Sequence, residues 1–286
     1  MVDVEVPEVD YTQYSNRQLA AVPLAVLGVA LLVLLAWYLA TGVPVAPGIE
    51  FTGGTELRIG TADSAAEIRQ TFARIELDSV QPIAGESSYI LQTQETNTDL
   101  IEEIARSAGY DVQQIQGRTA SFGSRSQIQA IIGLAVAFAG MSLLVFALFR
   151  TFVPSIAVVV SAFSDIMIPL ALMNVLGIKL SLGTVAALLM LIGYSVDSDL
   201  LLNNHILRRR GGFYESAYRA MRTGVTMTLT SIAAMVTMTV VATLLAIPLL
   251  PEIGLVLVLG LSADLMNTYM LNMSLLRWYK YEGVAR

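Results

Sequence analysis

Six long apolar blocks constrain this chain more than any other feature of its sequence. Each is long enough to cross a bilayer as a helix, which takes about 20 residues. The first block is too long for the apolar core of a secretory signal peptide and follows an acidic N-terminus, so we interpret it as a membrane span. The sequence therefore predicts a polytopic α-helical membrane protein with transmembrane helices at 19–41, 128–149, 153–175, 182–204, 224–247 and 253–275.

The distribution of basic residues predicts the orientation of these spans. Ten arginines and lysines flank the spans on one side, whereas the two short loops on the other side hold only Lys179. Because basic flanks stay in the cytoplasm, we expect a multi-pass protein of the cytoplasmic membrane with both termini inside. The N-terminal segment 1–18 and the tail 276–286 are then cytoplasmic, and the long segment 43–127 lies outside the cell.

The external segment has the pattern of a folded domain. Its strand-like and helix-like stretches alternate in the order β-α-β-β-α-β, which is typical of a ferredoxin-like α+β unit. Asp63 is the expected N-cap of the first helix, and Asn97 or Thr98 that of the second. We predict strands at 55–59, 79–83, 88–93 and 110–116 and helices at 64–75 and 98–109.

Composition narrows the function classes. The 286 residues include no cysteine and one histidine, His205, which argues against thiolate or histidine metal sites, and we expect no metal and no cofactor. The charge balance of 23 acids against 17 bases offers no basic face for nucleic acid. We find no phosphate-binding loop of the P-loop type. An acidic portion with only two lysines is typical of proteins that work in very high salt.

Four acids lie inside the predicted spans: Asp165, Asp197, Asp199 and Asp264. A charged residue at a helix centre costs about 2.5–3.5 kcal/mol on insertion scales, and such residues usually face a bundle interior and mark ion or proton paths. Burial disfavours the charged form of a carboxyl, so reversible protonation is available to these groups. The alternative is that they serve only as hydrogen-bonding partners between helices. For Asp165 and Asp264 the sequence does not distinguish a proton relay from such a structural role.

Asp197 and Asp199 are not equivalent, because residues two apart in an α-helix point about 200° away from each other. Asp197 lies deeper in its span and is the preferred functional acid. Asp199 lies closer to the cytoplasm, where it is expected to reach interfacial water. Arg222, at the start of the fifth span, can reach inward to pair with Asp197, or it can be an ordinary cytoplasmic anchor.

Several motifs, in order along nearly the whole chain, resemble those of the SecD/SecF protein-export membrane proteins. GIEFTGGTELRI (48–59) resembles the family's GIDFTGG signature, and IGYSVDSD (192–199) resembles the fourth-span motif of its SecF members, GYSxND. MRT (221–223) resembles the SRT that leads their fifth span, and 164–189 resembles their third-to-fourth span hairpin. Together with the acidic composition, the set identifies the chain as an archaeal, halophilic member of the SecF group.

The resemblance implies one half of a twelve-span RND-type bundle, with SecD as the other half. It implies the SecY channel complex and unfolded secretory polypeptides as further partners, and export assistance driven by the proton gradient. The sequence itself leaves open whether protons or sodium ions are coupled. Membrane lipids are a further expected partner, through the basic run RRRGG (208–212). The glycine-rich motif is expected to form a structural joint below the external domain, with direct substrate contact as a weaker reading. The residues of this joint are Gly48, Phe51, Gly53 and Gly54.

The fourth-span motif departs from the SecF pattern. Asp197 occupies the Asn position of GYSxND, Ser198 the Asp position, and Asp199 the next one, while VDSD also resembles the VDAN of SecD. The resemblance therefore leaves open whether Asp197 or Asp199 carries the role, and it implies that Arg222 matches the arginine that pairs with that carboxylate.

Three alternatives compete with an ion-coupled, non-enzymatic export subunit. A passive scaffold in the same complex would use its intramembrane acids only for packing. Half of another RND-type exporter would need a partner or a second copy. An intramembrane aspartyl protease is disfavoured because Asp264 lies in SADL rather than GxGD and Tyr194 is not followed by Asp.

Overall fold

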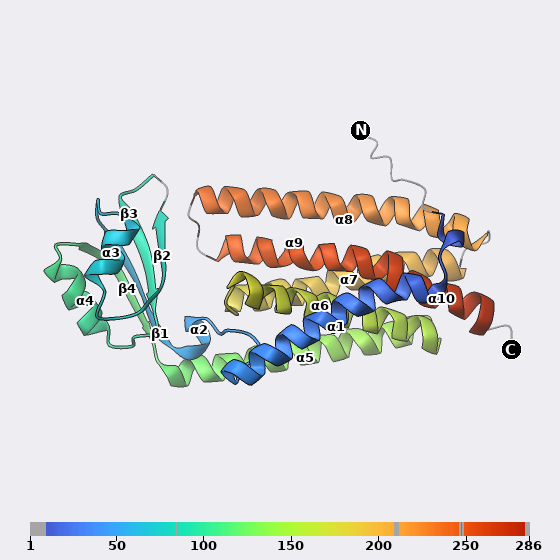
Figure 1. Ribbon diagram of the computed structural model, residues 1–286, viewed down its shortest axis with the longest axis horizontal. Helices are drawn as coiled ribbons and strands as arrows, with labels where there is room; N and C mark the ends of the chain where they lie inside the picture. Colours follow the sequence, from blue (N-terminus) through green and yellow to red (C-terminus); the bar gives the residue numbers. More distant parts are fainter. Residues whose placement is uncertain (1–9, 84, 209–211, 246, 248, 284–286) are drawn as a thin grey trace.

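The computed structural model describes residues 10–83, 85–208, 212–245, 247 and 249–283, so parts of the predicted N-terminal segment and tail lie outside the described residues. A helical bundle carries a small α+β domain at one end, and helix α1 begins and the last span ends at the other end (Figure 1). Within the described residues, six helices are long and apolar enough to span a membrane, as predicted. They are α1 (Asn16–Thr41), α5 (Ala120–Phe149), α6 (Phe152–Leu176), α7 (Leu182–Arg208), α8 (Phe213–Leu244) and the continuous segment Leu250–Gly283.

The last span changes its helical geometry along its length. It begins as α9 (Leu250–Met266), passes through the π-helical segment η2 (Asn267–Asn272), and continues through α10 (Met273–Trp278) and the π-helical η3 (Tyr279–Gly283). Helices α8 and α9–η3 both extend beyond the predicted blocks 224–247 and 253–275. The added first turns of α8 are amphipathic rather than uniformly apolar, and they bury Phe213, Ala217 and Met221, so a search for apolar blocks misses them.

The α+β domain has the predicted element order. It runs β1 (Gly54–Gly60), α3 (Ala65–Thr71), β2 (Leu77–Ile83), β3 (Ser88–Thr93), α4 (Thr98–Ser107) and β4 (Asp111–Arg118). The four strands pair antiparallel in the order β2-β3-β1-β4. The core consists of side chains from the sheet and both helices, namely Leu57, Ile59, Ile68, Phe72, Leu91, Ile101, Ala105 and Tyr110.

Side-chain caps fix where the two domain helices begin. Asn97 caps α4 by accepting from the amide of Leu100, as predicted. The expected Asp63 cap of α3 is wrong: Ser64 caps this helix in a capping box with Glu67. Asp63 instead accepts a hydrogen bond from the Tyr110 hydroxyl, at 2.8 Å. Helix α3 also ends at Thr71 rather than at residue 75.

The glycine-rich motif forms a compact joint between α1 and β1. Residues Ile49–Thr52 make one helical turn, α2, and the side chain of Phe51 is buried beneath it. The amide of Gly48 donates to the carbonyl of Leu180 in the α6–α7 loop, at 2.7 Å. Gly53 and Gly54 have φ angles of +83° and +143°, which favour glycine. The motif therefore ties the α+β domain directly to the loop between two central spans.

The bundle has a buried interior and an apolar exterior. Helices α6, α7 and α9 supply most of the buried residues, whereas α1, α5 and α8 expose long apolar faces. Because a bilayer solvates apolar side chains, such exposed faces suit lipid or another membrane protein rather than water. The three inner helices are the ones that carry the acids singled out from the sequence.

Gly54→Ala tests the joint. A Cβ atom at this position would lie 2.3 Å from the Thr93 carbonyl oxygen, so the backbone must shift as well as tolerate a positive φ. We expect the domain to lose about 1–3 kcal/mol of stability, the usual cost of overpacking, seen as faster proteolysis of the α+β domain in the purified protein. Gly85→Ala is the matched control, because Gly85 has a φ of +79° with open space around it. Equal proteolysis rates for the two variants would contradict the clash.

Candidate functional site

Three of the four intramembrane acids meet inside the bundle. Asp165 of α6, Asp199 of α7 and Asp264 of α9 are 1%, 0% and 2% exposed. Hydroxyl and amide side chains of the same helices and of η2 surround them. We call this group the carboxyl cluster; its members are Asp165, Asp199, Asp264, Ser195, Ser198, Asn267, Thr268 and Asn272.

Asp165 is held by two short hydrogen bonds. Ser195 Oγ donates to its Oδ2 at 2.6 Å, and Asn267 Nδ2 donates to its Oδ1 at 2.6 Å. The donors come from α7 and η2, so this one carboxyl links three membrane spans. From the sequence, Asp165 could be a member of a proton relay or a hydrogen-bonding partner between helices. The structure shows that it is a hydrogen-bonding partner between helices.

Asp199 and Asp264 share a hydroxyl. Thr268 Oγ1 lies 2.9 Å from Asp199 Oδ1 and 3.3 Å from Asp264 Oδ1. Ser198 Oγ adds a contact of 2.8 Å to Asp264, and Asn272 Nδ2 donates to Asp199 at 2.7 Å. A threonine hydroxyl has one proton to donate, so Thr268 serves one of the two carboxylates at a time unless a carboxyl is itself protonated.

The π-helical turn η2 supplies three of these partners. Asn267, Thr268 and Asn272 are all fully buried. Asp264, Thr268 and Asn272 follow one another at four-residue intervals, which places them on one side of a helix. Sequence reasoning missed Asn272, Ser195 and Ser198, although this polar spacing within an apolar span was the signal that could have found Asn272.

Asp197 lies elsewhere. It is exposed on the opposite side of α7 from Asp199, as the two-residue spacing predicts. The expectation that Asp199 reaches interfacial water is wrong, because its carboxyl is fully buried among α6, α7 and η2. The depth of a residue along a helix does not determine its burial, and here the rotation of α7 decides it. The preference for Asp197 as the working acid stays a prediction.

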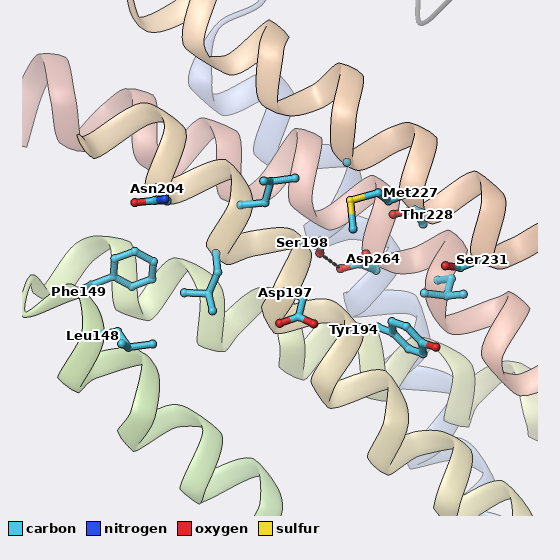
Figure 2. Close-up of a pocket in the computed structure, with 14 residues that line it drawn as sticks. Leu148, Phe149, Tyr194, Asp197, Ser198, Asn204, Met227, Thr228, Ser231 and Asp264 are labelled. Atoms are coloured by element: carbon cyan, nitrogen blue, oxygen red, sulfur yellow. Dashed lines mark hydrogen bonds between the residues drawn. The ribbon is translucent and has the colours of Figure 1, made fainter. Parts of the chain in front are cut away.

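Asp197 opens into a cleft of about 530 Å³ between α5, α7 and α8. Figure 2 shows Asp197 and Tyr194 on α7, facing this space, with Phe149 on one side and Met227 on the other. Ser198 and Asp264 line the same cleft, and the hydrogen bond between them is drawn in the view. Asp264 thus belongs to both the cleft and the carboxyl cluster.

Arg222 is exposed on α8, in the first third of this helix. Its carbonyl accepts from Thr226 Oγ1 at 2.8 Å, one of several threonine hydroxyls on this helix that bond back to their own backbone. The predicted pairing of Arg222 with Asp197 stays a prediction.

The fold and these buried acids define a class: a six-span membrane protein with one α+β domain and a polar cluster at its centre. The family described as "Protein export membrane protein SecD/SecF, C-terminal" matches residues 100–282. The chain is 65% identical to the protein-export membrane protein SecF of Haloferax volcanii and 60% identical to that of Haloquadratum walsbyi, in each case over the whole of both chains. It is 38% identical to SecF of Pyrococcus furiosus over 93% of both. The chain belongs to the SecD/SecF family, among its SecF members.

A solved structure has the same fold. The crystal structure of SecDF from Thermus thermophilus, titled a translocon-associated membrane protein, aligns with a TM-score of 0.70 at 18% identity. The alignment covers 96% of this chain and 39% of that chain. This chain therefore spans well under half of the solved one.

Thr268→Val tests whether the shared hydroxyl holds the cluster together. The substitution keeps the shape but removes one hydrogen-bond donor from the buried Oδ1 atoms of Asp199 and Asp264, which then keep Asn272 and Ser198 as donors. Loss of a buried hydrogen bond of this kind costs about 1–3 kcal/mol, so we expect a lower melting temperature in detergent. Thr268→Ser should retain most of the stability. Thr237→Val is the control, because the Thr237 hydroxyl bonds the carbonyl of Ala233 in its own helix. A Thr268→Val protein as stable as the wild type would show that the hydroxyl is not a structural tie.

Proposed function

We propose that this protein is the SecF subunit of a SecD–SecF complex, and that it assists the movement of unfolded secretory polypeptides through the SecY channel. Its SecF relatives are named protein-export membrane proteins. The solved SecDF chain is more than twice as long as the matched part, which supports a separate SecD chain as the other half. The basic flanks support cytoplasmic termini and an external α+β domain.

We further propose that export is coupled to a proton gradient through the carboxyl cluster, without enzymatic chemistry. The observation that carries this proposal is the Thr268 hydroxyl, which lies within hydrogen-bond distance of Asp199 and Asp264. The described partners of the three acids are hydroxyls and amides. Three like charges this close repel strongly in a medium of low dielectric constant, so the cluster is more stable with fewer than three charges.

Gain or loss of a proton would change which groups can donate. A protonated Asp264 can donate to Ser198 or Thr268, which frees the threonine proton for Asp199. An ionised Asp264 competes with Asp199 for that same proton. Because the hydrogen bonds join α6, α7 and the last span, a change in proton count alters the preferred contacts between three helices. Moving one charge across the membrane supplies about 2.3 kcal/mol per 100 mV, enough to shift such an equilibrium.

The cleft gives the cluster a route to the outside of the bundle. Asp264 and Ser198 form its inner wall, and Asp197 lies toward its open side. In this scheme Asp197 gathers or releases ions at the cleft, while Asp199 and Asp165 lie further in. A passive scaffold remains the competing function, because the same hydrogen bonds would also hold three helices rigidly together.

The exposed polar face of α7 is the surface we assign to SecD. Tyr194, Asp197 and Asn204 are exposed on this face. A carboxylate facing lipid near mid-membrane is costly, whereas a partner helix with polar groups can satisfy it. SecD therefore covers the cleft in the assembled complex.

Asp199→Asn tests the coupling. The change keeps the size of the side chain and removes its ability to ionise, so we expect precursor maturation in cells to fall to the level of a strain lacking the protein. The measurement is pulse-chase maturation of a secreted precursor, with membrane levels of this protein and of SecD checked. Asp197→Asn is measured beside it, and Asp111→Asn, at an exposed position in β4, is the control. Normal export by both the Asp197 and the Asp199 variants, with the complex intact, would favour the scaffold.

The absence of cysteine makes the SecD surface directly testable. Tyr194→Cys places a single thiol on the cleft face, and we expect it to cross-link to cysteines introduced in the membrane spans of SecD. Val29→Cys, on the exposed side of α1, is the control and should react with soluble reagents in detergent but not with SecD. Cross-linking of SecD from Val29 rather than from Tyr194 would place the partner on another face.

A further inference from the structure

A buried arginine closes the bundle at the end where α1 begins and the last span ends. Arg277 of α10 is 7% exposed. Its Nη1 donates to the carbonyl of Tyr11 and its Nη2 to the carbonyl of Tyr14, each at 2.7 Å, and its Nε donates to the Asn16 side chain. These acceptors are neutral, and among the described residues no carboxylate lies within ion-pair distance of Arg277. A buried cation without a counter-ion is costly, which favours an anion nearby.

Arg277 lies in the wall of a polar pocket of about 650 Å³. A second cation, the exposed Arg17, lines the same pocket, and Glu282 is the one acid among the lining residues. Trp278, Tyr281 and Tyr214 complete much of the wall. Tryptophan and tyrosine are the residues enriched at the level of lipid headgroups.

An apolar groove of about 770 Å³ adjoins this pocket, and Tyr14 lines both. The groove runs between the start of α1, α8 and the last span, on the outside of the bundle. Its lining is mostly apolar: Leu19, Val22, Met221, Val225, Leu265 and Met270 lie along it, with the polar tips of Tyr11, Tyr14, Tyr269 and Gln18 among them.

We propose that pocket and groove together bind one anionic phospholipid. The phosphate lies against Arg277 and Arg17, and one acyl chain lies in the groove. Two observations select this occupant: a buried cation without a described counter-ion in the pocket, and a mostly apolar groove that continues from it into the membrane. The bilayer supplies an amphiphile with this charge and shape at this depth, where an anionic headgroup is attracted to arginine.

The site has a structural consequence for the N-terminal segment. The backbone of Tyr11 and Tyr14 is held by Arg277, and the Tyr11 hydroxyl bonds the carbonyl of Tyr269 in η2. A bound phosphate would neutralise Arg277 and so stabilise the segment that lies against the π-helical turn. The lipid site is independent of proton coupling and of the identity of the partner subunit.

Native mass spectrometry of the purified full chain tests the proposal. The probes are phosphatidylglycerol and phosphatidylcholine with identical acyl chains, added separately to the delipidated protein in detergent. We expect one phosphatidylglycerol to be retained at concentrations where phosphatidylcholine is not. Arg17→Gln should weaken retention about fivefold, the equivalent of the roughly 1 kcal/mol that one arginine adds near an anionic lipid surface. Arg150→Gln, which removes an exposed arginine from the α5–α6 loop, is its control.

A groove-filling variant gives a second readout that does not depend on charge. Val22 is 48% exposed in the groove, so Val22→Trp can block the acyl chain without disturbing the core, and we expect it to lose the retained lipid. Leu39→Trp, at a 76% exposed position near the other end of α1, should retain it. Equal retention of both lipids, or a Val22→Trp protein that binds phosphatidylglycerol normally, would overturn the proposal. Cross-linking of Val22→Cys to SecD in membranes would also overturn it, by showing that a protein helix fills the groove.

Discussion

The burial of three carboxyls at the centre of a membrane bundle is the constraint on which the rest of this structure depends. Each acid would be costly in lipid, so each must find donors inside the protein. Asp165 and Asp199 find them on neighbouring spans. Asp264 finds one on α7, Ser198, and one in its own span, Thr268. The result is that α6, α7 and the last span form a polar-centred core, and α1, α5 and α8 are left on the outside with apolar faces.

The fold could be predicted from the sequence because its signals are local. Span length is set by bilayer thickness, and the element order of the α+β domain follows from periodicity and turn residues. The predicted N-cap of α3, Asp63, was wrong by one residue. Ser64 and Glu67 form a capping box, a pattern that is visible in the sequence three residues apart. The extension of α8 was missed because its first turns carry a narrow buried stripe rather than a continuous apolar block.

The candidate site was less predictable, for a physical reason. A sequence shows that Asp197 and Asp199 face different ways, but not which of them faces inward, because that depends on how α7 is rotated against α6 and the last span. The burial of Asp199 follows from donors 69 and 73 residues away, Thr268 and Asn272. The π-helical turn that positions those donors has no signature of its own in the sequence, apart from the four-residue spacing of Asp264, Thr268 and Asn272.

The two acids of α7 lie in different environments: Asp199 is fully buried, whereas Asp197 is exposed. This difference is consistent with different roles for the two carboxyls. Asp199 is fully buried, and its carboxyl accepts from one hydroxyl and one amide, those of Thr268 and Asn272. Asp197 lies in a cleft. Among the contacts between the described residues, its carboxylate has no hydrogen-bond or ion-pair partner. Asp264 contacts both environments through Ser198 and Thr268. A bundle built this way leaves a polar face of α7 exposed, and under the proposed assignment of that face to SecD the energetic cost of Asp197 is relieved when the partner covers the cleft.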